Sequence, residues 1–131
     1  GVKEWHETNK ILFIWTSLLQ EKFCPYMNTA ISDIPTKYRK YGNWALAFLN
    51  FNAICKIHQD PNDLKSGLAA VIPFGSWSGG ELVFPQLGME LNATKGDLIL
   101  FQSHLLKHKN NPIISGYRRS LVLTNHDCNI Y

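Results

Sequence analysis

Apolar residues recur at helical spacing in the first part of the chain, between residues 4 and 23. The apolar positions are Ile11, Ile14, Trp15, Leu18 and Phe23. Polar residues such as Glu7 and Gln20 lie between them, so the pattern predicts an amphipathic helix packed on the rest of the protein. Pro25 follows and is expected to end this helix. Residues 24–43 are less regular and contain turn residues at Asp33–Thr36 and Gly42-Asn43.

From residue 44 onward the pattern changes to short segments rich in branched and aromatic residues, bounded by Gly, Pro, Asn or Asp. We expect strands at residues 44–52, 53–58, 68–74, 81–84, 97–101 and 120–124. Many short strands separated by turns favour a barrel or jelly roll over alternating β-α units. We therefore expect one domain, with a helical preface at 1–43 and a mainly β core at 44–131.

Composition restricts the class of protein but not its partner. The chain has 131 residues, of which 45% are hydrophobic and 18% charged, as in a globular protein with a packed core. The net charge of +3 permits an anionic substrate without requiring one. The three cysteines include no C-x-x-C pair, which favours a reducing compartment over a disulfide framework.

The strongest apolar run, residues 11–19, is interrupted by Thr16 and Ser17 and is too short to span a bilayer, so we expect no membrane partner. We expect an intracellular protein, with the nucleus as one candidate compartment. The chain begins with Gly rather than Met, which is the expectation for a fragment or an excised domain. The sequence carries no signal for an oligomeric state.

Candidate chemistry begins at His58-Gln59-Asp60, which ends a predicted strand and precedes a turn cluster. In an extended segment residues i and i+2 point to the same side, so His58 and Asp60 can hold one ion. Two histidines and one carboxylate form the ligand set of non-haem Fe(II) oxygenases. Candidates for the third ligand are His104, His108 and His126. We favour His108, because the chain after it turns into the strand bearing Arg118 and should place both residues on neighbouring strands.

Arg118 and Arg119 compete for a second role, the binding of a keto-acid cosubstrate. On a strand Arg118 and Ser120 share one face, while Arg119 lies on the other. An inward Arg118 beside Ser120 offers a planar charged fork and a hydroxyl to one carboxylate. The alternative is that both arginines are solvated charges at a strand end.

Several further residues have a structural and a functional interpretation. Asn50 and Asn52 either line the site or only need hydrogen-bond partners in an apolar strand. The basic and aromatic segment Lys37–Tyr41 is a solvated face or a contact for nucleic acid. Trp77 is either a core residue or a platform on which a substrate stacks.

Together these motifs resemble the Fe(II)/2-oxoglutarate dioxygenases of the double-stranded β-helix fold. The resemblance covers about residues 44–125 and includes His58-Gln59-Asp60, Gly79-Gly80-Glu81-Leu82, Gly96-Asp97-Leu98-Ile99-Leu100, His108, Arg118 and Ser120. More narrowly, the segment from Leu105 to Ile113, with Gly116 and Arg118, looks like the TET/JBP-type oxygenases that are abundant in fungi.

The resemblance implies a double-stranded β-helix (jelly-roll) barrel with an N-terminal helix. It implies that His58, Asp60 and His108 hold Fe(II), and that Arg118, with Ser120 beside it, pairs with the distal carboxylate of 2-oxoglutarate. The expected activity uses O₂, releases succinate and CO₂, and oxidises a modified nucleobase such as 5-methylcytosine in DNA. The alternatives are a 2-oxoglutarate oxygenase acting on a protein side chain or small molecule, and an inactive β-barrel binding module.

Overall fold

The computed structural model describes residues 1–130 of the chain, and the side chains of residues 1–128. Two antiparallel sheets form the body, one of four strands in the order β1-β7-β2-β5 and one of three in the order β4-β3-β6. The helices are α1 (Val2–Phe23) and α2 (Asn28–Ser32), with short 3₁₀ helices at Pro25–Met27, Thr36–Tyr38, Pro85–Leu87 and Asp127–Ile130. The strands are β1 (Leu46–Phe51), β2 (Ala69–Gly79), β3 (Leu82–Phe84), β4 (Met89–Leu91), β5 (Ile99–Phe101), β6 (Lys109–Asn110) and β7 (Ile113–Thr124).

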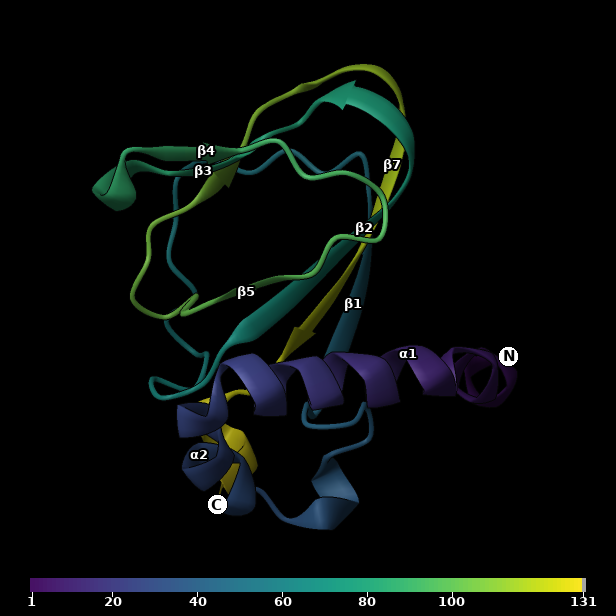
Figure 1. Ribbon diagram of the computed structural model, residues 1–131, viewed down its shortest axis with the longest axis vertical. Helices are drawn as coiled ribbons and strands as arrows, with labels where there is room; N and C mark the ends of the chain where they lie inside the picture. The colour runs from purple at the N-terminus through teal and green to yellow at the C-terminus, as the bar shows by residue number, and fades with distance from the viewer. Residues whose placement is uncertain (131) are drawn as a thin grey trace.

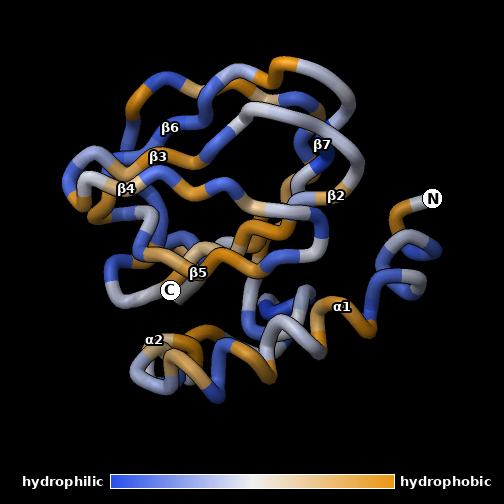
Figure 2. Tube along the Cα trace, turned by 45° about the horizontal axis from the view of Figure 1, so that its top comes forward, coloured by the Kyte–Doolittle hydropathy of each residue, from blue (hydrophilic) through white to orange (hydrophobic). Residues whose placement is uncertain are grey.

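Helix α1 and the small sheet lie on opposite sides of the large sheet (Figures 1 and 2). The longest ladder of the large sheet joins β2 to β7, from Ala70 opposite Leu123 to Gly79 opposite Ile113. Strand β1 pairs with the other edge of β7, and β5 pairs with β2. Within the described residues, none of the helices is long and apolar enough to cross a membrane.

The two faces of the large sheet have different surroundings because side chains alternate along each strand. On the face toward α1, Ala70, Ile72, Leu121 and Leu123 join the main core with Phe13. On the opposite face, Ser120, Val122 and Thr124 of β7 line a cavity. Strand β7 therefore contributes to the core and to the cavity through alternate residues.

Helix α1 packs on the core through a face that the apolar pattern does not predict. Its buried residues are Phe13, Thr16, Ser17 and Gln20. The predicted apolar face points outward: Ile11, Ile14, Trp15, Leu18 and Phe23 are all exposed. The prediction of a helix at 4–23 is confirmed, whereas the prediction of an inward apolar face is wrong.

Polar contacts with the turn at Tyr41–Trp44 explain this orientation. The Gln20 side-chain carbonyl accepts a hydrogen bond from Asn43 Nδ2 at 2.6 Å, and Ser17 Oγ accepts one from the Asn43 backbone N–H at 2.9 Å. Gly42 lies so close to α1, at φ +67°, that a Cβ atom there would overlap Ser17 Oγ. Buried polar groups need such partners, so this turn determines which face of α1 docks.

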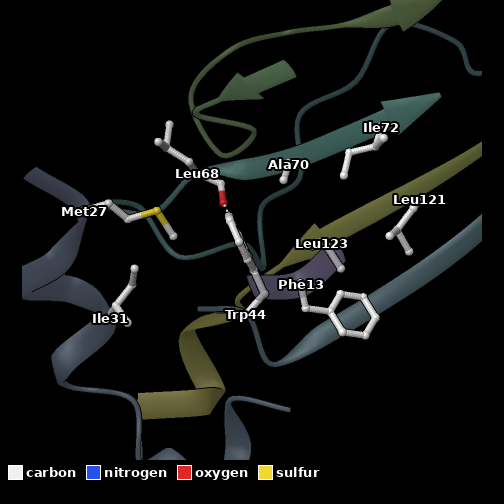
Figure 3. Close-up of a cluster of buried hydrophobic side chains, with 9 residues drawn as sticks. All are labelled: Phe13, Met27, Ile31, Trp44, Leu68, Ala70, Ile72, Leu121 and Leu123. Atoms are coloured by element: carbon white, nitrogen blue, oxygen red, sulfur yellow. Dashed lines mark hydrogen bonds between the residues drawn. The ribbon is translucent and has the colours of Figure 1, made fainter. Parts of the chain in front are cut away.

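Trp44 is the last residue of the same turn and is completely buried in the main core (Figure 3). Its indole Nε1–H donates to the Leu68 carbonyl at 2.9 Å, so the only polar atom of this side chain is paired. Met27 and Ile31, from the short helical turns after α1, pack in the same cluster.

Several strand boundaries differ from the predicted ones. Residues 53–58 form no strand, because Asn52 adopts φ +43° and ends β1, and only His58 makes an isolated bridge. Strand β7 begins at Ile113 rather than at residue 120 and passes through Gly116, where φ is +82°. The remaining predicted strands correspond to β1, β2, β3 and β5 with shifted ends.

The two tryptophans at Trp44 and Trp15 test this packing. We expect Trp44→Ala to lower the free energy of unfolding by about 3–5 kcal/mol, because it empties a core site. The matched control Trp15→Ala removes a side chain that is 60% exposed, and should change stability by less than about 1 kcal/mol. Urea denaturation measures both. Equal losses in the two variants would contradict the observed orientation of α1.

Candidate metal centre

An isolated antiparallel bridge joins His58 to His108, two residues that lie far apart in the sequence. The His58 N–H donates to the His108 carbonyl at 3.0 Å, and the His108 N–H donates to the His58 carbonyl at 2.9 Å. Residues directly opposite in such a pair place their side chains on the same side. The two imidazole ring centres accordingly lie 4.3 Å apart.

Asp60 completes a group of three. Its backbone N–H donates to the Ser103 carbonyl at 3.0 Å, which holds the turn after His58 against the segment that follows β5. Asp60 Oδ1 lies 3.5 Å from His58 Nε2, and Oδ2 lies 3.2 Å from His108 Nε2. One potential ligand atom from each residue lies within 4.8 Å of the others, so the group can hold a metal ion.

Both histidines present the same ring nitrogen to this group. His58 Nδ1 lies 2.8 Å from the Lys56 carbonyl, and His108 Nδ1 lies 2.8 Å from the Leu106 carbonyl. A carbonyl only accepts, so each Nδ1 carries a proton and donates it, and Nε2 is the ring nitrogen that faces Asp60. Metal-bound histidines are commonly oriented by a hydrogen bond of this kind.

The electrostatics of the group follow from its burial and its internal hydrogen bond. The hydrogen bond from His108 lowers the pKa of Asp60 below its usual value, although burial opposes this. Burial disfavours the charged form of His108, but the hydrogen bond to Asp60, the Leu106 carbonyl and nearby carboxylates outweigh it, so the pKa of His108 is raised. The carboxylate is therefore ionised at neutral pH and available to a cation.

A cavity of about 220 Å³ opens beside the three residues, between the large sheet and the small one. Its lining includes apolar residues from β1, β2 and β7, such as Phe48, Val71 and Val122. The polar residues that reach it, besides His58, Asp60 and His108, are Asn50, Cys55, Asn110, Ser120 and Thr124. The mixture of apolar walls and a few polar groups is typical of small-molecule sites.

Arg118 lies in a smaller side pocket, and Ser120 lines both this pocket and the cavity. Arg118 is only 7% exposed, as is expected for the inward face of β7, whereas Arg119 points into solvent. Nη1 donates to the Gly80 carbonyl, and Nη2 donates to the Ala53 carbonyl at 3.3 Å. Nε is buried and has no hydrogen-bond partner among the described residues.

Two backbone features position this guanidinium. Gly80 has φ +71°, and a Cβ atom there would lie 2.7 Å from Arg118 Nη1, so only glycine leaves room. The Asn52 side chain accepts from the Arg118 N–H at 2.7 Å. Burial lowers the pKa of Arg118, but an arginine stays protonated in proteins, so the side pocket holds a positive charge suited to an anion.

His108 and Arg118 do not lie on neighbouring strands, and that prediction is wrong. His108 precedes β6 of the small sheet, whereas Arg118 belongs to β7 of the large one. The two residues approach the cavity from opposite sheets, because the chain passes from the small sheet to the large sheet after Asn110.

The other candidate ligands lie outside the group of three. His126 Nε2 lies 3.3 Å from Asp63 Oδ1, and Ser103 Oγ donates to Asp63 Oδ2. Burial raises the pKa of Asp63. His104 is absent from the potential metal group as well. The contacts of Asp63 and Ser103 were missed at the sequence level, because no local spacing connects these residues.

The residues with two interpretations divide as follows. Asn50 lines the cavity, whereas Asn52 ends β1 and holds the Arg118 backbone. Trp77 is partly buried and lines the side pocket of Arg118. The segment Lys37–Tyr41 includes the 3₁₀ helix Thr36–Tyr38, and Tyr41 packs against Phe13 of α1, with 5.2 Å between ring centres.

No protein-family model matches the chain, and no curated protein matches it by sequence. Among solved structures, the chain is similar to NgTET1 in complex with 5mC DNA, with a TM-score of 0.82 and 20% identity over 92% of this chain. The likeness to NgTET1 establishes the fold. The double-stranded β-helix expected from the sequence is therefore confirmed, and so is the resemblance to TET/JBP-type oxygenases at the level of the fold.

The match covers 49% of the NgTET1 chain, so this chain spans about half of that protein. A viral collagen prolyl hydroxylase of Paramecium Bursaria Chlorella virus-1, in its 2OG complex, matches with a TM-score of 0.42 and 14% identity. That match covers 82% of this chain and 70% of the viral one, and is too loose to support an inference.

The pKa directions of His108 and Asp60 predict how stability depends on pH when a chelator removes metal. The contribution of His108 is fully present below its unfolded pKa, near 6.5, and is lost as pH rises through the higher folded pKa. The contribution of Asp60 is present above its unfolded pKa, near 3.8, and is lost as pH falls through the lower folded value. We therefore expect stability to decline from mildly acidic to alkaline pH.

Urea denaturation across this pH range, with the chelator present, measures the decline. Asp60→Asn should flatten it, because the neutral amide no longer favours a charged His108. Identical pH profiles for the variant and the wild type would contradict the pairing of these two side chains.

Proposed function

We propose that this chain is an Fe(II)/2-oxoglutarate-dependent dioxygenase that oxidises a modified nucleobase such as 5-methylcytosine in DNA. One observation carries the proposal: two imidazole Nε2 atoms and one carboxylate converge at a cavity that continues to a buried arginine with an unpartnered Nε. In this proposal residues 1–131 form one oxygenase domain, with 1–43 as a helical preface and 44–131 as the β-helix core.

The three donors fit Fe(II) in their chemistry. Two neutral imidazoles and one carboxylate leave coordination positions open, as a catalytic metal requires. Asp60 contributes one negative charge. The Nδ1 hydrogen bonds hold both Nε2 atoms toward Asp60, and a bound cation would take each Nε2 lone pair in place of a proton. Bound Fe(II), with 2-oxoglutarate and O₂, would supply the oxidative decarboxylation to succinate and CO₂ and the hydroxylation of the substrate.

Arg118 and Ser120 fit the far end of the cosubstrate. The Arg118 fork matches a carboxylate, and its burial makes such a charge pair less screened than at the surface. Ser120 Oγ adds a hydroxyl donor at the junction of the two pockets. The chain's own residues would thus bind and orient a dicarboxylate between metal and guanidinium, while the apolar wall limits access of water.

The proposed substrate is a nucleobase in DNA. The likeness to NgTET1, solved with 5mC DNA, supports this choice. A base in duplex DNA must leave the stack before it can enter such a cavity. The net charge of +3 is compatible with a polyanionic substrate.

Turnover of 2-oxoglutarate tests the reaction class. With Fe(II) and O₂, the wild type should release succinate, and His108→Ala and Asp60→Ala should abolish it by removing a metal ligand. His104→Ala is the matched control, because this histidine lies in the same loop outside the group of three, and it should retain activity. Nucleoside mass spectrometry after incubation with 5-methylcytosine DNA and unmethylated DNA tests the substrate.

The possible outcomes separate the alternatives. Succinate release without any change in the DNA would leave the oxygenase and redirect the substrate to a protein side chain or a small molecule. No turnover at all by Fe(II)-loaded protein would contradict the enzyme and favour a binding module.

Two neighbouring arginines test the cosubstrate site. Arg118→Met should weaken 2-oxoglutarate binding by about 2–5 kcal/mol, because it removes the buried partner of a carboxylate. Arg119→Met is the control, since Arg119 is exposed and lies on the opposite face of β7. Titration calorimetry with Mn(II) in place of Fe(II) measures binding without turnover. Equal affinities for the two variants would exclude Arg118 from the site.

A further inference from the structure

The outward face of α1 carries an apolar stripe that the packing of the domain does not use. Ile11 is 61% exposed, Ile14 45%, Trp15 60% and Leu18 58%. Residues three and four positions apart are neighbours on a helix, so these four side chains form one patch. Contiguous exposed apolar patches of this kind mark interaction sites.

A charged residue lies at each end of this apolar stripe. Glu7 lies one turn before Ile11, and Lys22 lies one turn after Leu18, on the same face of the helix. Both side chains are exposed. The face is therefore negative at its start, apolar in its middle and positive at its end.

We propose that α1 pairs through this face with α1 of a second copy of the chain, in the antiparallel direction. A register that sets Ile11 opposite Leu18 also sets Ile14 opposite Trp15. The same register brings Glu7 of each copy opposite Lys22 of the other. The contact is two-fold symmetric, so each of these pairs occurs twice.

The order of charges on this face of α1 favours an antiparallel second copy of the chain as its partner. A parallel pair would bring Glu7 against Glu7 and Lys22 against Lys22, which repel. The antiparallel pair converts both repulsions into attractions and also opposes the two helix dipoles. The exposed face of α1 is thus complementary to the same face of a second copy that runs in the opposite direction. Binding to an unrelated protein would not need this self-complementarity.

A groove beside the stripe offers room for the partner's side chains. It has a volume of about 350 Å³ and runs between α1 and the large sheet, where Leu12 and Leu19 face Ile72 and Leu98. Ile11 and Trp15 line both the groove and the stripe. Figure 1 shows α1 along the outside of the molecule, where a second copy can approach it.

The size of the patch indicates a weak dimer. Four apolar side chains per copy bury less than the roughly 800 Å² per partner of a standard stable interface. We therefore expect a dissociation constant on the order of 10–100 μM. Trp15 should dominate the affinity, because large aromatic side chains at the centre of an interface carry most of its energy.

Sedimentation equilibrium over a range of concentrations tests the proposal on the whole chain. The wild type should pass from monomer to dimer, and Trp15→Ala should stay monomeric throughout. Glu7→Lys and Lys22→Glu should each raise the dissociation constant roughly tenfold, since each places like charges together in both symmetric pairs. The combined variant Glu7→Lys/Lys22→Glu should restore wild-type association, because it exchanges the two charges.

The controls reverse exposed charges away from the face, with Glu90→Lys on β4 and Lys37→Glu in the 3₁₀ helix Thr36–Tyr38. Both should dimerise as the wild type does. A wild type that is monomeric at about 1 mM, well above the expected constant, would overturn the proposal. So would a combined variant no tighter than its single parents. All the changed side chains are exposed, and circular dichroism verifies that each variant is folded.

Discussion

The backbone bridge between His58 and His108 holds the candidate metal centre together. Its two hydrogen bonds, of 3.0 and 2.9 Å, join segments that come from different parts of the chain. Each histidine directs its Nδ1 at the carbonyl two residues before it, so the backbone also determines which nitrogen remains for a metal. Asp60 joins the pair because its own N–H is bound to the Ser103 carbonyl. Main-chain contacts therefore arrange the three donors.

The large sheet separates the part of the domain that provides stability from the part that provides chemistry. Leu121 and Leu123 of β7 pack in the core beneath α1, while Arg118 and Ser120 of the same strand face the pockets. A shift of β7 by one residue would exchange these two sets, burying a guanidinium in the core. The long ladder between β2 and β7 opposes such a shift, so the register of one strand pair underlies both functions.

Local patterns in the sequence predict the parts of this structure that depend on neighbouring residues. Alternation along a strand predicted that Arg118 would be buried and Arg119 exposed, and the spacing of His58 and Asp60 predicted that they would lie together. The predicted roles of these residues, and of Ser120, in holding metal and cosubstrate stay predictions. The fold class was predictable because a pattern of many short strands after one helix is compatible with only a few architectures.

The errors have a common physical origin in contacts between distant segments. The strand expected at 53–58 is absent because Asn52 leaves the extended region to reach the Arg118 backbone, which no local propensity encodes. His108 and Arg118 belong to different sheets, because the pairing of β6 with β3 is a long-range choice. The apolar pattern of α1 indicated the wrong buried face, because Asn43 supplies polar partners that outweigh the pattern.

A helix docked through Gln20 and Ser17 has little freedom to slide or rotate. Another seating would break the hydrogen bonds from Asn43 to Ser17 and Gln20, at a cost of about 1–3 kcal/mol for each buried group left unpaired. Apolar packing allows a helix to dock in many alignments, whereas directional hydrogen bonds allow only one. Substitutions on the exposed face of this helix can therefore accumulate without altering how the domain folds. The side chains on that face are also held at a constant angle to the sheet beneath the helix.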